Sequence, residues 1–85
     1  MAEYNVYFKK SVWKDFKSIP DKDLSNILQC IQELESDPRR PGSRKLTGQE
    51  RYRYRVGKYR ILYSIQDQEL TIWVVIIGHR KEVYR

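Results

Sequence analysis

The 85 residues suffice for one small domain, because a chain of this length buries only about 60 to 65% of its unfolded surface. A net charge of +6, from 17 Lys and Arg against 11 Asp and Glu, favours a polyanionic partner such as nucleic acid. The lone Cys30 excludes an internal disulfide, no Cys/His pair has zinc-ligand spacing, and no apolar run is long enough to cross a bilayer. We therefore expect one cytoplasmic domain over residues 1–85, without a metal or other cofactor.

The first 20 residues predict a strand and a helix. Apolar residues that alternate with polar ones indicate a short strand with one face toward the core: Tyr4, Val6 and Phe8. A helix is expected from a cap at Ser11 to the break at Pro20. Its apolar stripe has helical spacing and consists of Phe8, Val12, Phe16 and Ile19.

A second helix is predicted over about residues 21–36. Its stripe is apolar except for the last member and comprises Leu24, Ile27, Leu28, Ile31, Leu34 and Glu35. Asp21 and Asp23 lie near its positive amino-terminal end, where they are favourable. Cys30 falls just past the edge of the stripe, and no neighbour in sequence activates its thiol, so we expect a half-buried structural residue.

The middle of the chain carries most of the positive charge. Asp37-Pro38 ends the second helix, and residues 39–43 form a basic loop with turn chemistry. Lys and Arg are concentrated between residues 39 and 60, where Glu50 is the only acid, whereas most acids precede residue 40. The basic surface is therefore built mainly by this middle segment.

Residues 51–65 alternate polar with apolar on both sides of one glycine, which predicts a β-hairpin. A two-residue II′ turn at Gly57-Lys58 places Arg55 opposite Arg60. One face then carries Tyr52, Tyr54, Val56, Tyr59, Ile61 and Tyr63, and the other carries Arg53, Arg55 and Arg60. Like charges directly opposite each other destabilise a sheet, so we expect an anionic ligand to offset their repulsion.

A last strand is predicted from Glu69 to Ile77 after a turn at Asp67-Gln68, and its apolar run indicates burial on both faces. Counting across this turn opposes Ile61 to Val74. Trp73, Val75 and Ile77 then share the arginine face, where they could floor a groove or receive a partner segment, and Ile72, Val74 and Ile76 share the other. We predict an α+β fold of order β-α-α-β-β-β, an antiparallel sheet with two helices on its tyrosine face. The position of the first strand in the sheet stays open.

An open basic face with nearby aromatic residues suits RNA or DNA, although the arginines could also be solvated or paired with carboxylates. The carboxyl end holds the only histidine, His79, directly after a glycine, where it could act as an acid or base. No Ser-His-Asp set, phosphate-binding glycine loop or metal cluster is apparent. RNA cleavage needs none of these, because its own 2′-hydroxyl can attack the adjacent phosphate.

Residues 44–84 carry a set of motifs with specific spacing. They are Lys45-Leu46-x-Gly48, Tyr52-Arg53-x-Arg55, Gly57-x-Tyr59-Arg60-Ile61-Leu62-Tyr63, an apolar strand, Gly78-His79-Arg80 and Glu82-Val83-Tyr84. This set resembles the RelE family of toxin–antitoxin mRNA interferases. The resemblance implies a toxin that cleaves mRNA in the ribosomal A site, and a cognate antitoxin that wraps and inhibits it.

The resemblance also implies roles for individual residues. Arg53, Arg55 and Arg60 would bind the scissile phosphate, Arg80 would stabilise the leaving oxygen, and Tyr84 would stack and orient. Further RNA contacts are expected from basic residues around them: Arg44, Lys45, Arg51, Lys58 and Lys81.

Proton transfer is the role that stays open. The best-known relatives carry lysines at the positions of Arg53 and Arg55, and arginine is a poor base though a good phosphate ligand. His79 is therefore a further candidate. Strict alternation places His79 on the arginine face and Arg80 opposite, whereas the resemblance favours Arg80, so both are kept.

Two other functions are possible for such a chain. A ParE-type toxin shares the fold and poisons gyrase without cutting RNA, although Arg60, Arg80 and Tyr84 argue against it. A basic binding module without catalysis is the other alternative.

Overall fold

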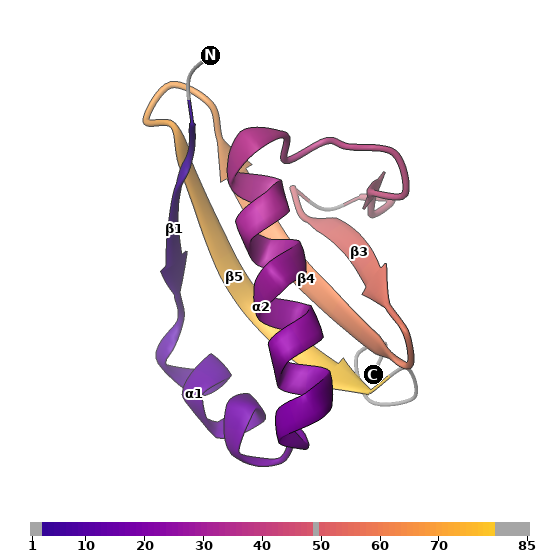
Figure 1. Ribbon diagram of the computed structural model, residues 1–85. Coiled ribbons are helices and arrows are strands. Elements are labelled where there is room, and N and C mark those ends of the chain that lie inside the picture. Colours follow the sequence, from indigo (N-terminus) through magenta and orange to yellow (C-terminus); the bar gives the residue numbers. More distant parts are fainter. Residues whose placement is uncertain (1–2, 49, 80–85) are drawn as a thin grey trace.

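The computed structural model describes residues 3–48 and 50–79 (Figure 1). The elements are β1 (Asn5–Phe8), α1 (Lys10–Lys17), α2 (Asp21–Ser36), β2 (Arg44–Lys45), β3 (Tyr52–Val56), β4 (Tyr59–Gln66) and β5 (Thr71–His79). Both helices lie on one face of a five-stranded sheet of order β1-β5-β4-β3-β2, which confirms the predicted α+β fold (Figure 1). The short strand β2 was not predicted. Within the described ranges, no helix is long and apolar enough to cross a membrane.

The sheet is mixed rather than wholly antiparallel, because β1 pairs parallel with β5. Val6 lies opposite Ile72 and Phe8 opposite Val74. The pairing ends where Lys9 N donates to Val74 O at 3.0 Å. Beyond it, the carboxylate of Asp15 accepts a hydrogen bond from Ile77 N at 3.1 Å. A side chain of α1 thus satisfies the backbone of β5 where β1 no longer reaches.

Helix α2 has the predicted bounds, whereas α1 begins one residue before the expected cap at Ser11. Lys9 is the N-cap residue and is extended, with φ −67° and ψ 152°. Its N–H still bonds to β5, so the helix starts directly after the last strand hydrogen bond. Leu28, which was predicted in the stripe of α2, is 44% exposed. It lies about 100° around the helix from Ile27, at the edge of the buried face.

The β3–β4 hairpin has the predicted register throughout, with Arg55 opposite Arg60 and Arg53 opposite Leu62. Gly57 has φ +58°, as the first central position of a II′ turn requires. A Cβ at this position would meet no atom within 4 Å, so the requirement for glycine is conformational rather than steric.

The β4–β5 register differs from the prediction at two points. The turn spans four residues, 67–70, so Gln66 pairs with Thr71 instead of Glu69. A bulge then follows, because Tyr63 pairs with Val74 but Leu62 pairs with Ile76. An extra residue reverses the faces beyond it, which places Ile77 under the helices and Ile76 on the other face. Arg60 consequently faces Gly78 rather than Val75.

The sheet carries a core on each side. The main core, under the helices, contains ten buried residues: Val12, Ile19, Ile27, Ile31, Leu34, Ile61, Tyr63, Ile72, Val74 and Ile77. The smaller core, on the other side, is formed by Leu62 and Val75 with partly buried Leu46, Trp73 and Ile76. We call this second side the open face. Because β5 contributes buried residues to both cores, the prediction that the last strand is buried on both faces is confirmed.

Candidate nucleic-acid interface

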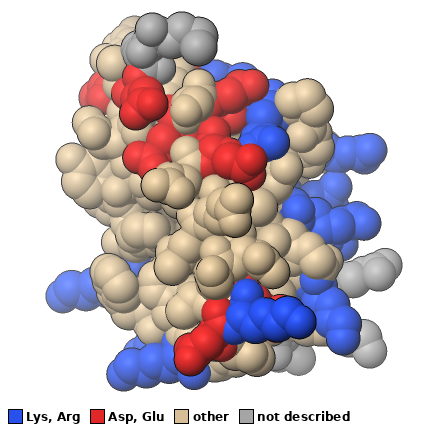
Figure 2. All heavy atoms as spheres, in the orientation of Figure 1, with Lys and Arg blue, Asp and Glu red and all other residues tan. Residues whose placement is uncertain are grey.

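Four arginines gather on the open face at the β2–β3–β4 end of the sheet. Arg55 lies opposite Arg60 across β3 and β4, and Arg44 lies opposite Arg53 across β2 and β3. Opposed residues project to the same side, so the sheet brings these side chains together. We call this set the arginine cluster. Figure 2 shows Lys and Arg side chains along the margin where β3 runs, and Asp and Glu side chains mainly near the carboxyl-terminal end of α2.

Arg60 has an unusual position for a charged residue. It is 3% exposed, and among the residues that the structure describes it is the only buried charged one. Its neighbour on β3 is Arg55, and its neighbour on β5 is Gly78, which has no side chain. Burial fixes the guanidinium group and strengthens its interaction with an anion, because a low dielectric screens charge less than water does.

The edge of the arginine cluster is hollowed. A cavity of about 370 Å³ is lined by Arg44, Arg53 and Arg55, together with Gly42 and Tyr54. Gly42 has φ +100°, and a Cβ there would lie 3.1 Å from the Tyr54 ring. Glycine thus lets the basic loop pack against β3, where it borders the cavity.

Side-chain hydrogen bonds hold this loop against the sheet. Arg39 Nη1 and Nη2 donate to the two carboxylate oxygens of Asp67, both at 2.9 Å, and Tyr4 Oη donates to Asp67 at 2.8 Å. These bonds, first from Arg39 and then from Tyr4, lower the pKa of Asp67 to about 2. On the buried side, Tyr63 Oη donates to Pro38 O at 2.7 Å. The loop that precedes the arginine cluster is therefore fixed to both β4 and the β4–β5 turn.

Several predicted site residues lie elsewhere. His79 is opposite Tyr59, with ring centroids 6.0 Å apart, in a hollow of about 270 Å³ that Asp15 also lines. It is therefore on the helix side, because the bulge in β5 reverses the alternation on which the prediction relied. Lys58 lines a hollow with Asp23 on the helix side. Lys45 is opposite Tyr52 and forms an exposed ion pair with Glu50 at 3.5 Å.

Three predicted residues lie outside the described ones: Arg80, Lys81 and Tyr84. Cys30 is half-buried as predicted, and burial raises the pKa of its thiol, which favours a structural role. Within residues 3–48 and 50–79, no three His, Cys, Asp or Glu side chains form a group that could hold a metal ion.

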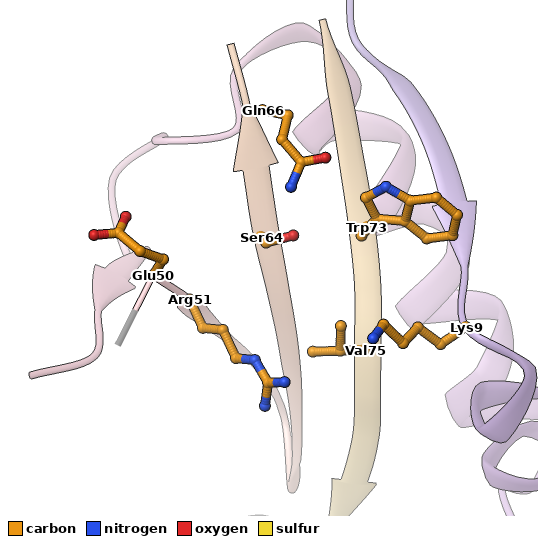
Figure 3. A pocket seen from close by; sticks show the side chains of 7 residues that line it. All are labelled: Lys9, Glu50, Arg51, Ser64, Gln66, Trp73 and Val75. Carbon is orange, nitrogen blue, oxygen red and sulfur yellow. The ribbon is translucent and has the colours of Figure 1, made fainter. Parts of the chain in front are cut away.

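A second hollow on the open face confirms in part the groove predicted there, because Trp73 and Val75 line it whereas Ile77 lies under the helices. Its volume is about 810 Å³, and Trp73 and Val75 from β5, Ser64 and Gln66 from β4, and Lys9, Glu50 and Arg51 line it (Figure 3). Trp73 had been placed on this face, but the first strand had no assigned place. Because β1 lies beside β5, Tyr7 contacts Trp73 and Lys9 reaches the hollow. The sequence did hold a signal for Tyr7, because it alternates with the core-facing residues of β1 and must therefore lie on the open face.

Comparison with known proteins decides the family. The model of the family described as "ParE toxin of type II toxin-antitoxin system, parDE" matches residues 6–84. The chain belongs to the RelE/ParE toxin superfamily. The toxin RelG of Mycobacterium tuberculosis is 30% identical over 86 residues, which cover 96% of this chain and 97% of RelG.

Solved structures agree with this membership of the RelE/ParE superfamily. The toxin–antitoxin complex RelBE2 of Mycobacterium tuberculosis contains a chain with a TM-score of 0.82 and 26% identity, covering 92% of this chain and 99% of that one. In the archaeal RelE–RelB complex of Pyrococcus horikoshii the TM-score is 0.78 at 28% identity, covering 98% and 100%. The protein is thus a toxin of a type II toxin–antitoxin system with a RelE-like fold.

Proposed function

We propose that this toxin is a ribosome-dependent endoribonuclease that cuts mRNA in the A site and thereby stops translation. The observation that supports it most is the placement of Arg55 opposite the buried Arg60 on an open sheet face. Adjacent guanidinium groups repel one another and bind a phosphate well, because they present paired donors that match its oxygens. A polyanionic substrate is the ligand that offsets the cost of this arrangement.

The reaction requires little from the protein besides charge and orientation. The 2′-oxygen of one nucleotide forms a bond to the adjacent phosphorus, the bond from phosphorus to the 5′-oxygen breaks, and the 2′-hydroxyl proton is lost while the leaving oxygen gains one. Arginine is a poor base and a good phosphate ligand, so Arg53, Arg55 and Arg60 act as phosphate ligands. Their role is to stabilise the extra negative charge of the pentavalent transition state.

The other roles rest on the sequence resemblance. Arg80 stabilises the leaving oxygen, and Tyr84 stacks on a base and orients the strand. His79 is not assigned to proton transfer, since the structure places it on the helix side next to Tyr59. The proposed partners are mRNA, the ribosome and a cognate antitoxin, in keeping with the RelE–RelB complexes among the structural neighbours.

The test is primer extension on mRNA bound to purified translating ribosomes. Arg60→Ala and Arg55→Ala should each lower the cleavage rate by roughly 100- to 1,000-fold, the loss typical for one transition-state donor. Arg55 is exposed, so its truncation should leave the fold nearly unchanged even if Arg60→Ala destabilises it. Lys22→Ala, an exposed lysine of α2, is the charge-matched control. Normal cutting by folded Arg55→Ala and Arg60→Ala would refute the assignment.

A ParE-type gyrase poison is the second candidate, because the matching family model carries that name. It predicts intact mRNA in the ribosome assay and double-strand DNA breaks when the protein is added to gyrase and supercoiled plasmid. A protein with neither activity would be a non-catalytic binding module.

A further inference from the structure

Two aromatic side chains form a surface pair at the β1–β5 end of the open face. Tyr7 on β1 lies directly opposite Trp73 on β5, with ring centroids 5.2 Å apart and an interplanar angle of 33°. Tyr7 is 50% exposed, and Trp73 is half-buried. Aromatic side chains at the surface offer a flat area on which a planar ligand can stack.

The hollow beside Trp73 has the size and chemistry of a small-ligand site. Its volume of about 810 Å³ falls within the range of such sites, roughly 300 to 1,000 Å³. Val75 gives it an apolar floor, while Ser64 and Gln66 on β4 add a hydroxyl and an amide that can both donate and accept hydrogen bonds (Figure 3). These groups suit the polar edge of a base next to its apolar face.

The charges around the hollow favour an anion. Lys9 and Arg51 point toward Val75 from opposite sides, so a ligand that stacks on Trp73 and extends over Val75 would pass between two cations (Figure 3). Glu50 is the one acid among its described lining residues, and its carboxylate points away from Trp73 (Figure 3). A planar group with a phosphate on each side matches this arrangement, because stacking and cation–phosphate contacts are how proteins hold single-stranded nucleic acid.

The hollow and the arginine cluster lie on the same face and along the same strand. Ser64 is four residues from Arg60 on β4, which is about 13 Å at a rise of ~3.3 Å per residue. Between them, Leu62 and Val75 are 4% and 6% exposed and give the face a closed apolar floor. We propose that Trp73 and Tyr7 form a stacking subsite for an unpaired nucleobase of the RNA strand whose phosphate is held at Arg55 and Arg60. This inference rests on the proposed function and adds a second contact to it.

Tryptophan fluorescence tests the stacking directly. In a Trp13→Phe background Trp73 is the only tryptophan. A single-stranded oligonucleotide with a non-cleavable 2′-deoxy linkage should quench its emission, and an abasic strand with the same number of phosphates should not. Equal quenching by the abasic strand would mean that only charge is sensed, and would overturn the proposal. Quenching by an acidic peptide but not by the oligonucleotide would overturn it in favour of a protein ligand.

Binding affinity gives a second readout. Trp73→Ala and Tyr7→Ala should each weaken binding of the oligonucleotide by roughly 5- to 150-fold, the loss typical when a stacking aromatic residue is replaced by alanine. Tyr7→Phe keeps the ring and should retain most of the affinity. Lys9→Gln and Arg51→Gln should each reduce the dependence of binding affinity on salt concentration by about one phosphate contact. The aromatic variants should leave this salt dependence unchanged. Wild-type affinity in both alanine variants would contradict the subsite.

The outcome is separable from that of the proposed function. If the protein binds and stacks RNA but does not cut it on ribosomes, the subsite stands and the nuclease assignment fails. If Tyr7→Ala and Trp73→Ala cut mRNA at the wild-type rate and need no higher toxin concentration than wild type, the nuclease assignment stands and the subsite fails.

Discussion

The two faces of the sheet are built from alternate residues of the same strands, yet they are constrained differently. Under the helices, Ile61, Tyr63 and Ile72 are fully buried. On the open face, Arg60 lies between Ile61 and Tyr59 in sequence but faces Arg55 across the hairpin. The covered face therefore supplies stability, and the open face tolerates a costly charge arrangement that a polyanion can offset. Substitutions one residue apart should have unlike consequences.

The largest effect is expected at Ile77, which the bulge in β5 places in the main core while it places Ile76 on the open face. Ile77→Ala should lower the free energy of unfolding by about 2 to 5 kcal/mol, because it leaves a cavity in the main core. Ile76→Ala, on the open face and only half-buried, should cost clearly less. Urea denaturation of both variants measures the difference. The opposite ranking would mean that β5 has no bulge at Val75.

A smaller effect on stability is expected from the Tyr63 hydroxyl, which links the sheet face under the helices to the segment just before the basic loop. Tyr63→Phe removes the donor to Pro38 O and should lower stability by roughly 1 to 3 kcal/mol, since a buried carbonyl loses its partner. Tyr52→Phe loses only an exposed hydrogen bond with Arg39 and serves as the control. Equal unfolding midpoints for Tyr63→Phe and wild type would show that water replaces the lost bond.

The smallest effect concerns the exposed ion pair of Asp67 with Arg39. The pKa of Asp67 is lowered from 3.8 to about 2 in the folded protein, so its contribution to stability is present above pH 4 and is lost as the pH falls toward 2. The stability difference between wild type and Asp67→Asn should therefore shrink over this window. Urea titrations at several pH values measure it. A difference that stays constant with pH would exclude the ion pair as its source.

Local signals were sufficient for the hairpin. Its period of two and the II′ turn at Gly57 fix the register of β3 against β4, because only two residues separate the strands and a slip would expose every apolar side chain. The same signals placed Arg53, Arg55 and Arg60 on one face. The bounds of α2 also followed from the sequence, since Pro20 and Pro38 flank a clear apolar stripe.

The remaining features required tertiary structure. The run from Ile72 to Ile77 is apolar on every residue, so no alternation marks the bulge at Val75 that moves His79 to the helix side. No turn connects β1 to β5, and their parallel pairing spans more than 60 residues of sequence, so only packing sets it. The sequence by itself therefore determined the three hairpin members of the arginine cluster through short-range geometry, whereas Arg44 joins them through the unpredicted strand β2. The structure alone decided that Tyr7 contacts Trp73 and that Lys9 lines the same hollow as Trp73, because both depend on which strand lies beside which.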